Sequence, residues 1–556
     1  MMPFWKLTFF VSLSLLLFSC AQPRPVSGGP KDVNGPKILQ SIPTNFTTNF
    51  HGNEIMMEFD EYVLVPKLAA ELVVSPPLKY AVEYKIKGKR VYFSIKDTLQ
   101  PNTTYNFNFG DAIVDLNENN PLDSSLFVVS TGTSLDSGSI SGTVKNAYTL
   151  KAVENATVLL YSPTDDSALY KGGPAYITKT DKAGNYFLNY LSHKDYKIYV
   201  LETPGSNYAY QQFTSVGFYP ELANPTENNA LDFFLFKEID TSQYVSKNTS
   251  KEYFNFVLGF HSDLSEPKFE FVTTTNTQKY IIEELDLDSF MFWIEGEDEI
   301  DSVTVFISDE TGYSDTAKVG LEDRKSFEKS SKKNEGKSPV MVRPNIKNGV
   351  LHYFDSLLLN ASRPIKSWNL DSILFVDGTD TSNVRDLMDA QKLYLEMPYS
   401  KRGSSEDIKS IHVKYDWKPG KNYAFILYSG AVTDIIDQTN DTTFIKFKTN
   451  TFEDYGSFRF TVQVPGYTGP LYMELLDENG KFLRNYKIKS GDEIYHKLAL
   501  PGKYQMRLVI DENGNDKWDT GDLEKEILPE HIVYYNGMIE IRPNWDVEET
   551  WLVSFK

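Results

Sequence analysis

The sequence has a single cysteine, Cys20, in 556 residues. A chain with one cysteine can form no internal disulfide and offers no thiol pair to a structural zinc ion. Basic residues are also in deficit, because 56 lysines and arginines stand against 76 acidic residues and give a net charge of −20. An acidic chain repels phosphate backbones and anionic lipid head groups, so we expect neither of them as a partner.

Sequence motifs of the common enzyme classes are missing. The seven histidines are scattered, and no two have the spacing of a metal-binding pair such as HExxH. The segment Gly138 to Gly142 has Ile140 where a GxSxG nucleophile elbow has serine. We therefore predict a protein that is not an enzyme and has no small-molecule substrate. A hydrolase whose carboxylates come from distant parts of the chain is the alternative.

Only one long apolar run occurs, Leu7 to Phe18, and Lys6 precedes it. The run is too short to span a bilayer comfortably, and it predicts a cleaved signal peptide over residues 1–19. It ends in Ser19-Cys20, which resembles the lipobox of bacterial lipoproteins. The resemblance implies cleavage before Cys20 and a covalent lipid, such as palmitate, on Cys20. An ordinary signal peptide followed by an incidental cysteine is the alternative.

Residues 20–36 are rich in proline and glycine and predict a flexible tether between lipid and body. Many surface lipoproteins of the Bacteroidota carry acidic residues directly after the acylated cysteine, whereas the first acid here is Asp32. That spacing weakens a surface assignment. We still expect an outer-membrane protein on the cell surface, with the periplasmic face as the alternative.

The body is rich in residues that favour pleated sheet, including 34 tyrosines and 36 phenylalanines. In residues 37–133, Glu54 to Phe59 reads as a strand, and two alternating segments flank Lys87-Gly88-Lys89 as in a hairpin. Short strands at this density predict an antiparallel β-sandwich. We expect the whole body to be all-β, a multidomain string of such sandwiches.

The same region resembles the bacterial Ig-like domain named after the SbsA surface-layer protein. The residues that carry the resemblance are Ile42-Pro43, Phe59-Asp60-Glu61, Leu99 to Tyr105, Asp115-x-Asn117 and Ser130-Thr131-Gly132. The preceding Gly28 to Asp32 resembles the start of Bacteroidota lipoproteins built on this domain.

A second, divergent copy is predicted over residues 341–450. The segment Trp417 to Tyr423 parallels Leu99 to Tyr105 at an offset of 318 residues, and the same offset places Thr449 on Thr131. Upstream, Leu357 to Ile365 takes the place of Ile55 to Val63. A long insertion after Pro364 leaves the strand register between these segments open.

Two further regions separate the copies. Residues 137–238 resemble the regulatory-like, transthyretin-like β-sandwich of carboxypeptidases, with Asp181-x-x-Gly184 as a tight turn before the Tyr186 strand. The resemblance implies a spacer or binding role. Residues 239–335 form a strand-rich domain that we assign to no family, and the charged segment 322–338 is predicted to be a loop or linker.

The C-terminal region, 451–556, predicts another β-sandwich with one loop rich in aspartate and asparagine. Calcium prefers oxygen ligands. Five oxygen-bearing side chains fall at positions 1, 3, 5, 9 and 12 of an EF-like loop: Asp511, Asn513, Asn515, Asp519 and Asp522. We predict a calcium site, with a solvated turn as the alternative. For Asp115-x-Asn117-x-Asn119 we favour the turn. We expect the tryptophans at 518, 545 and 551 to fill the core, with sugar stacking as the alternative.

These features predict a non-enzymatic outer-membrane lipoprotein that offers a protein-interaction scaffold, for example an accessory subunit of an outer-membrane β-barrel assembly or export complex. Its partners would be the membrane, through the lipid anchor, and an outer-membrane protein. A glycan-binding surface lipoprotein for nutrient capture is one alternative. A cell-surface adhesive or structural protein is another.

Overall fold

The structure, a computed structural model, describes residues 32–161, 167–227, 230–272, 279–296, 300–323, 325, 339–352, 355–396 and 409–553. Cys20, the signal peptide and most of segment 322–338 lie outside the described residues. Nearly all regular structure is β-strand, arranged in predominantly antiparallel sheets, which confirms the predicted all-β multidomain fold. Among the described residues, no helix is long and apolar enough to cross a membrane.

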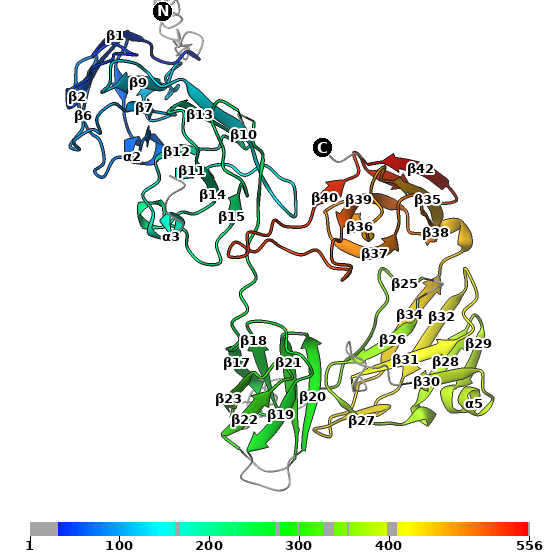
Figure 1. The fold of residues 1–556 in the computed structure, drawn as a ribbon. Coiled ribbons are helices and arrows are strands. Elements are labelled where there is room, and N and C mark those ends of the chain that lie inside the picture. Colours follow the sequence, from blue (N-terminus) through cyan, green and yellow to red (C-terminus); the bar gives the residue numbers. More distant parts are fainter. Residues whose placement is uncertain are drawn as a thin grey trace, which may run out of the picture. The chain divides into compact units, whose positions relative to one another are not determined.

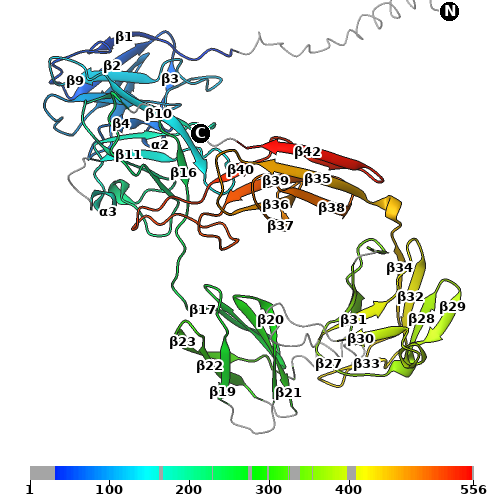
Figure 2. The ribbon, with the colours of Figure 1, turned by 45° about the vertical axis from the view of Figure 1, so that its right-hand side comes forward.

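The described residues divide into two compact units (Figures 1 and 2). One unit takes in the described parts of Met1–Lys237 together with Gly521–Ile527. The other takes in those of Glu238–Thr520 and Leu528–Lys556.

The first Ig-like domain has the strand order of a constant-type immunoglobulin domain. Its elements are β1 (Ile38–Ile42), β2 (Glu54–Phe59), β3 (Val63–Leu64), α2 (Leu68–Glu71), β4 (Val73–Ser75), β5 (Glu83–Lys87), β6 (Arg90–Ser94), β7 (Thr104–Asn108), β8 (Val114–Asp115) and β9 (Leu126–Ser130). One sheet has the order β1-β2-β6-β5 and the other β4-β7-β9, while β3 pairs with β8.

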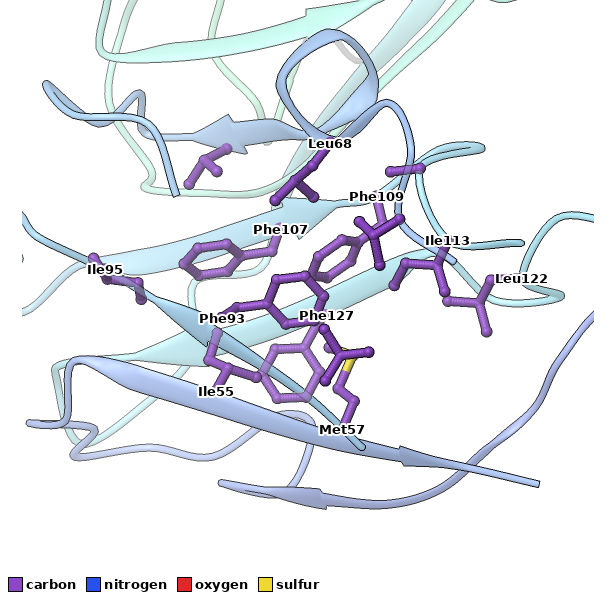
Figure 3. Packing of buried hydrophobic residues seen from close by; sticks show 14 of the residues in the cluster. Ile55, Met57, Leu68, Phe93, Ile95, Phe107, Phe109, Ile113, Leu122 and Phe127 are labelled. Atoms are coloured by element: carbon purple, nitrogen blue, oxygen red, sulfur yellow. The ribbon is translucent and has the colours of Figure 1, made fainter. Parts of the chain in front are cut away.

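The core of this domain lies between its two sheets (Figure 3). Ile55 and Met57 are fully buried and alternate with less buried residues along β2, as the period of a strand requires. They face aromatic rings from the other strands, and the rings of Phe93 and Phe109 have centroids 4.8 Å apart. Burial of each such side chain stabilises the fold by roughly 1.5–3 kcal/mol.

Residues 137–238, which were predicted to be regulatory-like, fold into a sandwich of a three-stranded and a four-stranded sheet. Its elements are β10 (Gly138–Asn146), β11 (Thr157–Tyr161), α3 (Ala168–Lys171), β12 (Tyr176–Lys179), β13 (Asn185–Leu191), β14 (Lys197–Leu201), η2 (Ser206–Tyr208), β15 (Val216–Phe218) and β16 (Phe233–Leu235). The sheets have the orders β13-β10-β16 and β12-β11-β14-β15. The pair of β10 and β16 is parallel, so the last strand of the domain lies beside the first.

The middle domain, which the sequence left without a family, also has constant-type immunoglobulin strand order. Its strands are β17 (Val245–Glu252), β18 (Asn255–Phe260), β19 (Lys268–Val272), β20 (Lys279–Asp286), β21 (Ser289–Glu295), β22 (Ser302–Ser308) and β23 (Ser314–Gly320). The sheets are β17-β18-β21-β20 and β19-β22-β23.

The second Ig-like domain repeats the plan of the first with additions. Its elements are β24 (Val342–Pro344), β25 (Val350–Leu351), β26 (Leu357–Ala361), β27 (Ile365–Trp368), η3 (Leu370–Ser372), β28 (Ile373–Asp377), β29 (Asp380–Asn383), α5 (Val384–Asp389), β30 (Leu393–Glu396), β31 (Ser410–Tyr415), β32 (Asn422–Leu427), β33 (Val432–Asp434) and β34 (Thr443–Thr449). Its sheets are β24-β26-β31-β30 and β25-β34-β32-β28-β29, and β27 pairs with β33 as β3 does with β8.

The C-terminal domain has the same topology as the sandwich of residues 137–238. Its elements are η4 (Phe452–Asp454), β35 (Gly456–Gln463), β36 (Leu471–Asp477), β37 (Phe482–Ile488), β38 (Glu493–Ala499), β39 (Gly502–Ile510), β40 (Ile532–Tyr534), β41 (Ile539–Ile541) and β42 (Asp546–Leu552). The three-stranded sheet is β38-β35-β42, with β35 and β42 parallel (Figure 2). The other sheet is β37-β36-β39-β40, and β41 also pairs with β39.

The match between these two domains extends to single residues. Val144 pairs with Phe233 in the parallel ladder of the first copy, and Val462 pairs with Trp551 in the second, 318 residues later on both strands. A tyrosine near the start of β14 and of β39 donates its hydroxyl to the carbonyl four residues upstream, Tyr196 at 3.1 Å and Tyr504 at 2.5 Å. The chain therefore contains a duplicated pair, an Ig-like domain followed by a sandwich of this second topology, on either side of the middle domain.

Candidate functional site

The predicted calcium loop lies between β39 and β40, where the first copy has the connection from β14 to β15. Asp511 is 1% exposed, and its carboxylate accepts backbone N–H groups from Gly514 (2.7 Å), Asn515 (3.0 Å) and Asp516 (2.9 Å). Asp516, at the sixth loop position, has a φ of +63°, a conformation that EF-hands assign to glycine. The aspartate thus shapes the loop through its own backbone.

The other predicted ligands fall into two groups. The side-chain amides of Asn513 and Asn515 both donate to one carboxylate oxygen of Asp519, from Asn515 at 2.8 Å. Hydrogen bonds thereby connect Asp511, Asn513, Asn515 and Asp519. Asp522 instead forms an ion pair with Lys525 at 2.7 Å. Among the described residues, no group of three or more His, Cys, Asp or Glu side chains is placed to hold a metal ion.

A buried glutamate that the sequence analysis did not single out supports this loop. Glu530 accepts the backbone N–H of Glu512 at 2.8 Å and that of Asp519 at 3.0 Å. Burial raises the pKa of Glu530, the two backbone donors lower it, and the nearby carboxylates of Asp519 and Asp511 raise it again. The loop therefore concentrates negative charge, which is the electrostatic setting a cation requires.

The tryptophans of the C-terminal domain differ in environment. Trp551 is buried in the core, as predicted. The prediction is wrong for Trp545, which is 54% exposed because it lies in the turn before β42, with the guanidinium of Arg542 at 4.9 Å from its ring centroid. Trp518 is partly buried and donates its indole N–H to the carbonyl of Glu530 at 2.9 Å.

The turn predicted at Asp115 is confirmed. The Asp115 loop, residues 115–121, follows β8, and Asp115 accepts the backbone N–H groups of residues 117 to 120 at distances from 2.6 to 3.1 Å. Burial alone would raise the pKa of Asp115, but these four donors bring it below its usual value. Asp115 thus shapes its loop through the backbone, as Asp511 does in the C-terminal domain.

The equivalent loop of the second Ig-like domain, the Asp434 loop of residues 434–439, is built in the same way. Asp434 accepts the backbone N–H groups of Ile436 (3.0 Å) and Gln438 (2.8 Å). It also forms an ion pair with Nε of Arg363, and both side chains are buried, Asp434 completely and Arg363 with 6% exposure. In the second copy, an internal cation thus neutralises the loop aspartate.

The Asp434 loop is also a contact between domains. Ile435 is 6% exposed and packs with Phe254 and Trp293 of the middle domain in one apolar cluster. Next to this cluster, Lys409 bonds to Glu283 of the middle domain at 2.9 Å and lies over the Trp293 ring at 5.5 Å. The Trp293 indole N–H donates to the other oxygen of Glu283 at 2.8 Å. An Ig-like loop in this chain therefore docks another sandwich through an apolar tip and a charged rim.

The sequence comparisons agree with the first Ig-like domain. Residues 32–131 match the family model of the bacterial Ig-like domain. No curated protein matches the chain.

Several solved structures show weak similarity. The Bacillus anthracis TIE protein is 11% identical, with 96% of this chain and 76% of that chain covered and a TM-score of 0.15. The S-layer protein rSbsC(31-844) is 9% identical, with 90% and 66% covered and a TM-score of 0.14. The Bacteroides ovatus mixed-linkage glucan utilization locus SGBP-B is 11% identical, with 70% and 90% covered and a TM-score of 0.17. With TM-scores this low, the three likenesses carry no argument about function.

Proposed function

We propose that this protein is a non-enzymatic lipoprotein of the Bacteroidota outer membrane that serves as a scaffold for protein contacts. Acylated Cys20 would fix the chain to the membrane, and the duplicated Ig-like and regulatory-like pairs would set the reach of the body. We expect the body on the cell surface, with the periplasmic face as the alternative. In this role the chain would be an accessory subunit of an outer-membrane β-barrel assembly or export complex.

One observation carries the proposal. Within this chain, an Ig-like loop already recognises a neighbouring sandwich by burying Ile435 against Phe254 and Trp293. The fully desolvated centre with a charged rim has the composition of a specific protein interface. The first copy repeats the loop without that neighbour in its own unit, which supports a contact with a second protein.

The proposal is tested by purifying the full chain, tagged at the C-terminus, from membranes in mild detergent. The expected result is a stoichiometric outer-membrane protein that co-purifies and is identified by mass spectrometry. The matched control is Cys20→Ser, which should lose this partner together with the membrane. Repeated recovery of the wild-type chain alone would overturn the scaffold role, and protease treatment of intact cells would assign the face.

A glycan-binding role is favoured by one specific feature, the exposed Trp545 ring. Exposed tryptophans stack on sugar rings. A glycan array with the full chain tests this role, with Trp545→Ala as the matched variant. Binding that disappears in the variant would support nutrient capture over the scaffold role.

A further inference from the structure

Glu61, Tyr62 and Leu116 form a corner of the first Ig-like domain. The equivalent corner of the second Ig-like domain, around Arg363 and Ile435, packs on the middle domain. Along β2 and β26, Met57 corresponds to Leu359, and the same offset of 302 places Glu61 on Arg363. The register agrees, because Val63 pairs with Asp115 as Ile365 pairs with Asp434. Leu116 and Ile435 each follow the loop aspartate directly.

The exposure of the two corners is opposite. Ile435 packs on the middle domain and is only 6% exposed, whereas Leu116 is 50% exposed. Tyr62, which precedes β3 and lies in register with Leu116, is 57% exposed, and Leu64 is 36% exposed. The first copy therefore presents at its surface the apolar loop tip that the second copy buries.

The charge of the two corners is opposite as well. Where Arg363 neutralises Asp434, Glu61 adds a carboxylate beside Asp115. Burial and the nearby carboxylates of Asp115, Asp60, Asp32 and Glu118 raise the pKa of Glu61. Lys89 does not pair with these carboxylates: its ammonium group donates to the backbone carbonyl of Asp60 and lies 5.8 Å from the Tyr62 ring centroid.

This charge pattern selects the partner. The middle domain presents Glu283 to Lys409, so a surface of that kind would be repelled by the acidic corner of the first copy. A partner that fits must bring the missing cation next to an apolar side chain. Arginine suits this role because its planar guanidinium pairs with carboxylates and stacks on aromatic rings such as Tyr62.

The position of the corner along the chain narrows the partner further. The carbonyl of Asp32 accepts the side-chain amide of Asn120 at 3.1 Å, so the chain enters the domain at the Asp115 loop. Asp32 is 12 residues from Cys20, and an extended chain covers at most about 3.6 Å per residue. If Cys20 is acylated as proposed above, the corner lies within about 40 Å of the membrane surface.

We infer that the Glu61–Tyr62–Leu116 corner is a docking site for a membrane-resident protein that presents an arginine or lysine beside an apolar side chain. The inference rests on the proposed function for the membrane location, and it adds where the partner binds and by which chemistry. The first Ig-like domain takes from this partner the cation that the second supplies from Arg363.

The test is site-specific photo-crosslinking in intact cells with the full-length chain. Benzoylphenylalanine replaces Leu116, and the control position is Leu39 on β1, which is 68% exposed in the same domain. We expect one membrane-protein adduct from position 116 and none from position 39. The cross-linked peptide of the partner, read by mass spectrometry, should contain arginine or lysine next to apolar residues.

The decisive variant is Glu61→Arg, which copies the second Ig-like domain. It should reduce the adduct at least about tenfold, because it repels the partner's cation. Its melting temperature should stay equal or rise, because the new guanidinium can pair with Asp115. Loss of the adduct in a stable variant cannot then come from misfolding.

Other outcomes would overturn the inference. These are an equal adduct in Glu61→Arg, an equal adduct from Leu39, or an adduct only within the chain itself. A calcium-induced rise in melting temperature that Glu61→Arg removes would assign the corner to an ion. If the co-purifying protein persists while position 116 gives no adduct, the inference fails and the proposed function stands. If the wild-type chain purifies alone, both fail.

Discussion

Thr131 and Thr449 make the same hydrogen bonds, 318 residues apart. Thr131 Oγ1 donates to the carbonyl of Gln100 at 2.6 Å and accepts the N–H of Thr103 at 3.0 Å. Thr449 Oγ1 donates to the carbonyl of Lys418 at 2.5 Å and accepts the N–H of Lys421 at 3.1 Å. The hydroxyl holds the turn before β7 or β32 against the last strand, β9 or β34, of its domain.

Replacing Thr449 by valine should loosen this turn in the second Ig-like domain alone. The change leaves two backbone groups without partners, at a cost of about 1–3 kcal/mol. Hydrogen exchange of peptides covering 418–427 should accelerate, while peptides covering 100–109 provide the internal control. Thr131→Val should give the reverse pattern, and Thr449→Ser should behave as wild type. Equal acceleration in both domains would contradict a local role.

Ile435→Asp should release the middle domain from the second Ig-like domain. A carboxylate cannot replace an isoleucine against Phe254 and Trp293, and loss of such a side chain costs about 2–5 kcal/mol even without added charge. Tryptophan fluorescence should shift to the red, and the amide hydrogen exchange of residues 290–294 should become faster. Leu116→Asp, at the equivalent exposed position, should change neither. Unchanged fluorescence in Ile435→Asp would contradict the claim that Ile435 holds the two domains together.

Calcium should raise the melting temperature of the full chain through the C-terminal loop. Asp511→Ala should abolish the rise, but it also removes three backbone hydrogen bonds. Asp519→Asn is therefore the sharper variant, because it keeps the size of the side chain and removes one charge. If a chelator leaves the melting temperature of the wild type unchanged, the loop does not bind calcium.

His496 should make the C-terminal domain sensitive to mild acid. Burial and then the charge of Arg484 lower its pKa, so the unfolded chain binds this proton more tightly than the folded one. Stability is thus complete above the unfolded pKa of about 6.5 and falls as the pH drops from there through the folded value. His496→Leu copies Leu188, the residue at the equivalent ladder position of the 137–238 sandwich, and should flatten this decline.

The measurement is calorimetry of the C-terminal transition between about pH 8 and pH 5, a range that brackets the unfolded histidine pKa. At the alkaline end, the variant should differ from wild type by two lost contacts, the 2.9 Å hydrogen bond to Tyr486 and the ring stack on Phe458. The same acid dependence in both proteins would show that another group governs it.

The first Ig-like domain and its divergent copy were predictable because their constraints lie close together in sequence. Tyr105 and Tyr423 each begin an inner strand and accept the N–H five residues upstream, at 2.9 and 2.8 Å. This hydrogen bond forms only if a short turn of fixed length precedes the tyrosine. The five-residue spacing is therefore the same in both copies, although their sequences have diverged. The regulatory-like resemblance of residues 137–238 rested on a similar local turn at Asp181, which accepts the N–H of Ala183 at 2.8 Å.

The repetition of the 137–238 sandwich in the C-terminal domain was missed because few identical residues mark it. Gly138 and Gly456 hold the same position in the ladder, since Gly138 pairs with Leu191 at the end of β13 and Gly456 pairs with Ala499 at the end of β38. That pair and the Tyr196–Tyr504 pair were the available signals, and loops of different length separate them. In the sequence of the middle domain, the only signal was the alternation of apolar and polar residues, which many β-sandwiches share.

The docking corner was out of reach of the sequence for a different reason. Leu116 and Ile435 are both aliphatic residues after a loop aspartate, and nothing local distinguishes them. Their exposure depends on whether another domain lies opposite, which is a tertiary property. The sequence alignment of 357–365 with 55–63 already places Arg363 on Glu61, but only the structure shows that Arg363 pairs with a loop aspartate.

The most direct test of membrane attachment compares the wild type with Cys20→Ser after metabolic labelling with an alkyne analogue of palmitate. The account predicts label and membrane pelleting for the wild type, and an unlabelled, soluble chain of full length for Cys20→Ser. A Cys20→Ser chain that still sediments with membranes, without label, would contradict it.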